Sequence, residues 1–199
     1  MAQAKVLNDQ DVERVLRYLD TKQHASRNKA MFLLSMGCGV RIKELVSIQI
    51  ADVLDRSGGI RTEVYLKRDQ TKGREGRTVY LSEKMRELVH GYLCERFGLR
   101  DLLAVTMTDT SRALFSNQKN ANRGFSPSTG CQMFHYWFKD CQIEHGSSHS
   151  GRRSFITNLA NKGTAIHILK SLAGHRSIST TAAYLYSSPS QLKAAVELV

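Results

Sequence analysis

The chain has 199 residues, 41% of them hydrophobic and only 2 of them proline, a composition that suits one packed and largely helical domain. No apolar run reaches the roughly 18 residues of a membrane span, and the N-terminus has no apolar signal core, so we expect a cytoplasmic protein with no membrane partner. The 29 Lys and Arg residues outnumber the 18 Asp and Glu residues, and the net charge of +11 favours a polyanionic partner such as nucleic acid.

The first quarter of the chain predicts three helices. Asn8 caps a helix start, and the residues that follow place an apolar face at helical spacing: Val12, Val15, Leu16 and Leu19. A second helix is expected over residues 26–36, where Gly37-Cys38-Gly39 ends it. A short helix then resumes over residues 41–48.

The middle of the chain changes character. Two β-rich runs, residues 63–66 and 78–81, flank a polar stretch that contains glycine, and this pattern predicts an antiparallel β-hairpin. Ser82 can cap a helix that continues to about Phe97. Residues 98–126 give the weakest pattern: Leu114-Phe115-Ser116 fits a buried strand or a turn, and a polar, basic loop follows.

The last third predicts four helices, at about 127–141, 150–162, 165–172 and 179–187. Gly163 and Gly174 end two of them. A final segment, residues 191–199, carries apolar side chains at helical spacing. We therefore expect a mainly α fold with one small antiparallel β-hairpin.

Three distant segments carry side chains that suit an anion. Arg41 lies where a glycine-rich break meets a helix, with Glu44 on the same face three residues later. His149 and Arg152 stand at i and i+3 at a helix start, where a negative charge is favoured. In the third segment a helix, a glycine break and a histidine precede Tyr184. Taken singly, these patterns favour a surface ion pair, a basic helix cap and an ordinary tyrosine.

Together the segments resemble the tyrosine recombinase, or phage integrase, family. Four boxes of that family recur here in the family's order: T-G-x-R-x-x-E-L, K-G-x-x-x-R, H-x-x-R and L-G-H-x-S-I-x-T-T-x-x-Y. They are similar to residues 39–45, 72–77, 149–152 and 172–184, respectively, with Ala173 as a substitution in the last box. The resemblance covers roughly residues 7–187 and implies the catalytic-domain fold of the family.

The resemblance implies a site-specific recombinase that cleaves and rejoins DNA through a 3′-phosphotyrosyl intermediate, with Tyr184 as the nucleophile. Arg41 and Arg152 would hold the non-bridging phosphate oxygens, because a guanidinium binds oxygens bidentately and stays charged. A free phenol ionises only at about pH 10, so it needs a base to take its proton, and His149 would be that general base. Covalent storage of the bond energy removes any need for ATP.

The resemblance assigns supporting roles to three more side chains. Lys72 on the hairpin would protonate the leaving 5′-oxygen, and His175 would bind the phosphate or position the nucleophile. Glu44 would orient Arg41 or His149, because a carboxylate that touched the phosphate would repel it. No cofactor and no metal is implied. The cysteines also lack a zinc or disulfide pattern, scattered as they are at Cys38, Cys94, Cys131 and Cys141.

Further basic residues are predicted to contact DNA, namely Arg68, Arg74, Arg77, Lys119 and Arg123. The sequence also departs from the family pattern. Arg153 stands where many members have a second histidine, and Gly151 replaces a usual apolar residue. Tyr186 is a rival nucleophile two residues past Tyr184, although the spacing from Gly174-His175 favours Tyr184.

The box-bearing helices begin near Met1, so we expect residues 1–199 to be a single catalytic domain without the core-binding domain of typical members. This architecture resembles the recombinases that invert fimbrial promoter segments in bacteria. It implies a nucleoid-associated enzyme that acts on double-stranded DNA as a dimer or tetramer, with accessory DNA-binding proteins. Residues 188–199 could pass into a neighbouring protomer as an exchange helix or fold back, and the sequence leaves both open.

Two other functions stay open at this point. A type IB topoisomerase uses similar residues without exchanging partners, but the small size, the boxes and the exchange segment favour recombination. A DNA-binding regulator with a silent active site is the non-enzymatic alternative. Six intact catalytic positions argue against it.

Overall fold

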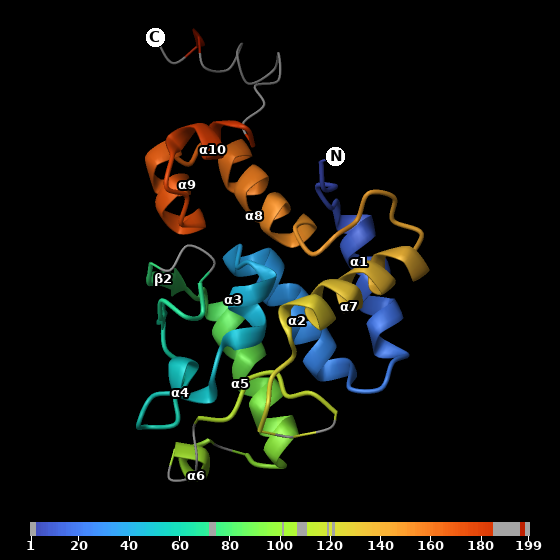
Figure 1. Ribbon diagram of the computed structural model, residues 1–199, viewed down its shortest axis with the longest axis vertical. Helices are drawn as coiled ribbons and strands as arrows, with labels where there is room; N and C mark the ends of the chain where they lie inside the picture. The colour runs from blue at the N-terminus through green and yellow to red at the C-terminus, as the bar shows by residue number, and fades with distance from the viewer. Residues whose placement is uncertain are drawn as a thin grey trace.

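The computed structural model describes residues 3–71, 75–100, 102–106, 111–118, 120, 122–184 and 196–197. These residues form a mainly helical fold with one two-stranded antiparallel sheet, which confirms the predicted fold class (Figure 1). The helices are α1 Asp9–Asp20, α2 Ala25–Cys38, α3 Ile42–Ser47, α4 Ile50–Val53, α5 Glu83–Phe97, α6 Leu103–Thr106, α7 Pro127–Asp140, α8 Ser150–Asn161, α9 Ile166–Ala173 and α10 Ile178–Ala182. The strands are β1 Glu63–Leu66 and β2 Arg77–Tyr80.

Helix α1 begins where the sequence predicts, because its cap is entirely local. The side chain of Asn8 accepts a hydrogen bond from the Asp11 amide (2.8 Å), and the Asp11 carboxylate accepts one from the Asn8 amide (3.2 Å). This reciprocal capping box satisfies two amides that the first turn of a helix leaves without partners. The helix then buries Val15 and Leu19 against the core.

Helix α2 is the centre of the fold and packs against α1, α3, α5 and α8 (Figure 1). It buries Met31 and Phe32 completely, and it continues through Cys38, two residues beyond the predicted end at residue 36. The chain turns at Gly39, which has a left-handed backbone (φ +59°). A Cβ atom there would lie 2.4 Å from the Phe155 ring, so the turn requires glycine.

The predicted β-hairpin is confirmed, with β2 beginning one residue earlier than expected. The register pairs Val64 with Val79 and Leu66 with Arg77, and alternation along β1 buries Val64 and Leu66. The connection between the strands is fixed where the structure describes it, because Lys43 Nζ donates to the Thr71 carbonyl (2.8 Å).

The segment between α5 and α7 contains no strand in its described part. Leu114 and Phe115 are fully buried, and the neighbouring backbone makes only isolated bridges, from Ala113 to Gln49 and from Ser116 to Gly124. The expectation of a buried strand or turn at residues 114–116 therefore resolves to an irregular buried segment.

Helices α7, α8 and α9 match the predicted ranges within one residue at each end, and Gly174 (φ +60°) ends α9 as expected. The prediction of a helix over residues 179–187 is wrong in length. Helix α10 stops at Ala182, and the Tyr184 amide donates to the Thr181 carbonyl (3.0 Å), which tightens the chain into a turn. Residues 185–187 lie outside the described residues, as do the predicted exchange segment 188–199 and the helix 191–199 apart from 196–197.

Helices α8, α9 and α10 lie together beside the hairpin and the end of α2 (Figure 1). In this arrangement the described parts of the box segments meet, because Arg41, Arg77 and Arg152 donate hydrogen bonds to the carbonyls of residues 172–174. None of the helices in the described ranges has the length and apolar character that a bilayer crossing needs.

Candidate active site

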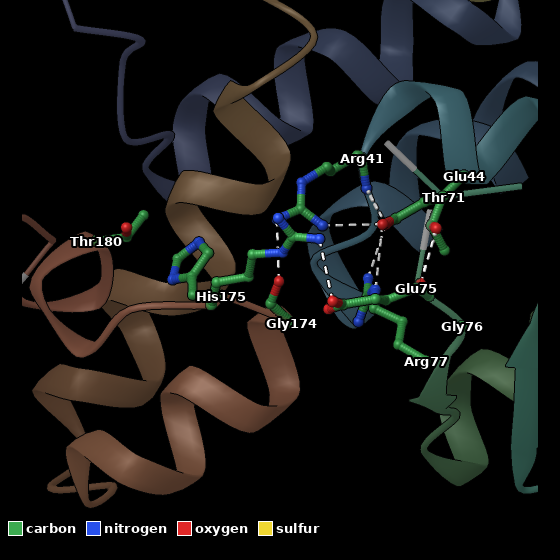
Figure 2. Close-up of a pocket in the computed structure, with 10 residues that line it drawn as sticks. Arg41, Glu44, Thr71, Glu75, Gly76, Arg77, Gly174, His175 and Thr180 are labelled. Carbon is green, nitrogen blue, oxygen red and sulfur yellow. Dashed lines mark hydrogen bonds and ion pairs between the residues drawn. The ribbon is translucent and has the colours of Figure 1, made fainter. Parts of the chain in front are cut away.

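A pocket of about 420 Å³ opens between α3, β2 and the turn from α9 to α10 (Figure 2). Its walls come from three segments that the sequence singles out: the first box, the hairpin and the last box. The residues that line it are Arg41, Glu44, Thr71, Glu75, Gly76, Arg77, Gly174, His175, Arg176 and Thr180.

Glu44 is the buried centre of one side of this pocket. Its side chain is completely inaccessible to solvent, and Arg41 and Arg77 converge on it (Figure 2). One carboxylate oxygen accepts from Arg41 Nη1 (2.9 Å) and Arg77 Nε (3.2 Å), and the other from the Arg41 amide (2.8 Å) and Arg77 Nη2 (2.8 Å). Burial alone would raise the pKa of Glu44, but the hydrogen bonds and charges of Arg77 and Arg41 outweigh it and lower the pKa. Glu44 is therefore ionised.

Arg41 owes its place to the start of α3. Its extended backbone precedes the first turn of that helix, so its amide faces the Glu44 carboxylate one turn later. Its Nη2 also donates to the Gly174 carbonyl (3.2 Å). The guanidinium is thus fixed between α3 and the end of α9, and it faces the pocket.

Arg77, which the sequence predicts as a DNA contact, lines the pocket. It is bonded to Glu44 and, through Nη1, to the Leu172 carbonyl (2.9 Å), an internal role that the sequence pattern alone does not indicate. Its aliphatic stem lies so close to Gly174 that a Cβ atom there would be 2.6 Å from Arg77 Cδ. The signal that could have found it is the fixed arginine of the K-G-x-x-x-R box.

Arg152 reaches the same region from the first turn of α8. It is 4% exposed, and it donates to the carbonyls of Gly39 (Nη1, 2.7 Å) and Ala173 (Nη2). Burial, and next the charge of Arg41, lower the pKa of this guanidinium to about 9, although Glu44 and Tyr184 act in the opposite direction. A guanidinium in such surroundings favours the arrival of an anion.

His175 follows Gly174 and is buried. Its Nδ1 lies 2.9 Å from the Thr181 hydroxyl, and its ring stacks on that of Tyr184, with centroids 5.7 Å apart and planes 22° apart. Burial, and then the charges of the nearby arginines, with Arg152 first, lower the pKa of His175 to about 4. The imidazole is therefore neutral near pH 7, and it holds the Tyr184 ring beside the pocket.

This arrangement suits a phosphodiester. Four guanidinium groups (Arg41, Arg77, Arg152 and Arg176) and two carboxylates (Glu44 and Glu75) lie in or beside the pocket, which leaves a net charge of two positive charges. A phosphodiester brings one negative charge and gains more as an oxygen attacks it, so the pocket matches the transition state better than the ground state. The phenol of Tyr184 does not line the pocket itself but lies beside it, stacked on His175 and within electrostatic reach of Arg152.

The sequence pattern that defines the Phage integrase family matches residues 5–191. This chain belongs to the phage integrase family. Tyrosine recombinase XerA of Pyrococcus furiosus is 27% identical over 194 residues, which cover 97% of this chain and 61% of that protein. Tyrosine recombinase XerC of Vibrio vulnificus is 30% identical over 182 residues, which cover 92% of this chain and 53% of that protein. The chain thus spans between half and two thirds of the length of these relatives.

Solved structures of integrase family proteins share the fold. XerA recombinase matches with a TM-score of 0.72 at 22% identity, over 100% of this chain and 66% of that one. The Tn1549 transposon integrase in complex with a circular intermediate DNA matches with a TM-score of 0.75 at 20% identity, over 100% and 67%. The catalytic domain of bacteriophage HP1 integrase matches with a TM-score of 0.61 at 19% identity, over 98% and 95%. The described fold is the tyrosine recombinase catalytic-domain fold.

Not every residue expected of an integrase family site lines the pocket. His149 directly precedes α8, is exposed and is not among the lining residues. Its carbonyl accepts a hydrogen bond from the Arg153 amide (2.9 Å) in the first turn of α8. Lys72 lies outside the described residues, between Thr71 and Glu75, which both line the pocket. Among the expected DNA contacts, Arg68 and Arg123 are exposed, and Arg74 and Lys119 lie outside the described residues. The rival nucleophile Tyr186 also lies outside them.

Proposed function

We propose that this protein is a site-specific recombinase that cleaves and rejoins double-stranded DNA through a 3′-phosphotyrosyl intermediate, with Tyr184 as the nucleophile. The observation that carries the proposal is the meeting of Arg41, Arg152 and His175 beside Tyr184, around a pocket with uncompensated positive charge. Such a pocket stabilises the charge that grows on a phosphodiester under attack.

In the proposed reaction the Tyr184 oxygen attacks phosphorus while Arg41 and Arg152 hold the two non-bridging oxygens. The new bond joins the Tyr184 oxygen to phosphorus, and the bond from phosphorus to the 5′-oxygen breaks. The phenol proton goes to a base, for which His149 is the proposed group, and the 5′-oxygen takes a proton from Lys72. Rejoining runs the same steps in reverse, so the energy of the broken bond is kept.

His175 and Glu44 act in this scheme without exchanging a proton. His175 is neutral near pH 7 because its pKa is lowered to about 4, and its stacking on Tyr184 supports a role in holding the nucleophile. Glu44 fixes Arg41 and Arg77 in the orientation in which they face the phosphate.

The proposed partner is double-stranded DNA. XerH recombinase, whose structure is a post-cleavage complex with its palindromic difH substrate, shares the fold with a TM-score of 0.69 at 22% identity, and this supports DNA as the substrate. The proposal includes DNA contacts by Arg68 and Arg123, together with Arg74, Arg77 and Lys119. It also includes a homo-oligomer on DNA, accessory DNA-binding proteins, and work at the nucleoid.

Covalent capture tests the proposal. The protein is incubated with a pool of random-sequence duplexes that each carry a nick, so that cleavage releases a short end and traps the adduct. We expect wild type to retain DNA after denaturation with detergent and Tyr184→Phe to retain none. Tyr136→Phe is the matched control, because Tyr136 is 56% exposed and lies on α7, outside the pocket.

Wild type that traps no member of the pool would contradict the proposed function. An adduct that survives in Tyr184→Phe would move the nucleophile elsewhere, with Tyr186 as the first alternative. Exchange of strands between two differently labelled duplexes then separates recombination from a topoisomerase-like reaction, which reseals only the duplex that it cut.

A further inference from the structure

Arg153 follows Arg152 on α8 and occupies the position at which many members of the family have histidine. Its Cζ atom lies over the Tyr184 ring, 5.9 Å from the ring centroid. This distance is within the range in which a guanidinium is attracted to the face of an aromatic ring, about 6 Å. The Tyr184 ring therefore has contacts from two segments, Arg153 on α8 and His175 before α10.

The hydrogen bonds of Arg153 do not account for its position. Its Nη2 donates to the Gln3 side chain at the surface, and its Nε is buried with no hydrogen-bond partner in the described part of the chain. A buried N–H group without a partner destabilises a fold. Arg152 differs, because both of its bonds are to buried backbone carbonyls. A structural explanation thus fits Arg152 and does not fit its neighbour.

The chemistry of the nucleophile supplies the missing explanation. A phenol that attacks phosphorus loses its proton, and the negative charge that develops spreads from the oxygen into the ring. A cation over the ring attracts this charge more strongly than it attracts the neutral phenol, so it stabilises the transition state more than the ground state. Among the described residues, Arg152 also interacts electrostatically with Tyr184 and His175 stacks on its ring, and His175 is neutral near pH 7.

We propose that Arg153 is a positioning residue for the nucleophile: it holds the Tyr184 ring and stabilises the negative charge that the ring gains during cleavage. The inference rests on the proposed function, in which Tyr184 is the nucleophile. In rejoining, the same charge appears when the Tyr184 oxygen leaves phosphorus, so both steps depend on Arg153.

Three variants test this role in the nicked-duplex assay, with duplexes that wild type has enriched from the pool. Arg153→Met removes the charge and keeps the length, and Arg153→Lys keeps the charge. Arg17→Met removes one exposed positive charge from α1, outside the pocket. We expect Arg153→Met to slow adduct formation about tenfold at pH 7, with the loss smaller at higher pH, where the phenol needs less help. Arg153→Lys should recover most of the rate, and Arg17→Met should match wild type.

Equal rates and equal pH profiles for wild type and Arg153→Met would overturn the proposal. So would an equal loss in Arg153→Met and Arg153→Lys with the profile unchanged, because that result indicates a packing role. Arg153→His, with the residue common in the family, takes the place of Arg153→Met if the methionine variant fails to fold, and its expected rate lies between those of wild type and an uncharged variant.

A second readout needs no DNA. In free protein labelled with 3-fluorotyrosine, the ¹⁹F resonance that disappears in Tyr184→Phe should shift in Arg153→Met and stay in place in Arg17→Met. An unmoved resonance would overturn the contact itself. A shifted resonance together with no wild-type adduct would leave the contact standing and contradict the proposed function instead, so the two failures are distinguishable.

Discussion

The pocket and the side chains directly beside it form a site with two halves, which hold positive charge in different ways. In the Glu44 half, formed by Arg41, Glu44 and Arg77, one buried carboxylate accepts hydrogen bonds from both guanidinium groups. In the Tyr184 half, formed by Arg152, His175 and Tyr184, the arginine is held by backbone carbonyls and the histidine is neutral. The first half neutralises much of its charge internally, whereas the second keeps its charge for a ligand.

This difference separates two tasks within one site. A buried ion pair with complete hydrogen bonding fixes its members in one geometry, and losing one partner leaves an uncompensated buried charge. Carbonyl oxygens also fix a guanidinium, but they leave its full charge uncancelled. The Glu44 half therefore acts as a rigid support, and the Tyr184 half carries the uncancelled charge that the proposed phosphate substrate needs.

The largest expected effect comes from breaking the support. Glu44→Gln leaves Arg41 and Arg77 without a counter-charge, and we expect it to lower the free energy of unfolding by about 3–5 kcal/mol. Urea denaturation measures the loss. Added phosphate should restore part of it, because the anion replaces the missing charge in the pocket.

Glu13→Gln is the matched control for that variant. Glu13 pairs with Arg17 on the surface of α1, where both side chains are more than 60% exposed, so the change should cost less than about 1 kcal/mol. If Glu44→Gln lowers the free energy of unfolding no more than Glu13→Gln does, the buried carboxylate does not support the two arginines.

The second effect is a pH dependence of stability that comes from His175 in the Tyr184 half. The pKa of His175 is lowered from 6.5 to about 4, so between these values the unfolded chain binds a proton that the folded chain does not. Stability from this group is complete above pH 6.5, falls as the pH is lowered toward 4, and is constant below that. The complete fall should be about 3–4 kcal/mol, since the pKa is lowered by about 2.5 and each pKa unit corresponds to about 1.4 kcal/mol.

Denaturation of wild type and His175→Gln at pH 7 and pH 4 measures this contribution. The variant should lose less stability on acidification than wild type does, whereas His135→Gln, at an exposed position of α7, should behave as wild type. Bound phosphate should reduce the fall in wild type, because the anion favours the protonated imidazole. An identical acid response in His175→Gln would show that the Tyr184 half does not hold a neutral histidine.

The smallest expected loss of stability comes from Gly174, where the two halves of the site meet. Gly174 accepts from Arg41 and packs against Arg77, and its backbone is left-handed (φ +60°). Gly163 is also left-handed (φ +82°), but a Cβ atom there would meet nothing within 4 Å. We expect Gly163→Ala to cost about 1 kcal/mol from backbone strain alone and Gly174→Ala about 1–2 kcal/mol more, because Arg77 must move. Thermal denaturation compares the two variants, and equal losses of stability would mean that Arg77 does not pack tightly against Gly174.

Much of the fold follows from local rules and could be predicted. The cap formed by Asn8 and Asp11 and the alternation of Val64 and Leu66 depend on residues close in sequence, so the pattern shows them. The segment around Leu114 has no such period. It is held by Arg96, whose Nη1 donates to the carbonyls of Ala113 (2.7 Å) and Leu114 (2.8 Å). A side chain that takes the place of a neighbouring strand produces no periodic pattern in the sequence.

The site divides in the same way. The boxes indicate that Arg41, Arg152, His175 and Tyr184 belong together, but not how their charges are balanced. Arg77 and Glu44 are 33 positions apart, and their pairing depends on how the hairpin packs against α3. The contact of Arg153 with Tyr184 likewise requires α8 and the turn after α10 to be neighbours. Such long-range pairs are properties of the tertiary structure and carry no local signature.

The bonds of Arg152 have a consequence for a chain that is still folding. The guanidinium joins the carbonyl of Gly39, 113 positions earlier, to that of Ala173, 21 positions later. A nascent or partly unfolded chain can carry its tyrosine and still lack the joint that closes the phosphate pocket. The charged surroundings of Tyr184 therefore form only in the completed tertiary structure, so the strand cleavage proposed for this protein would be confined to fully folded copies.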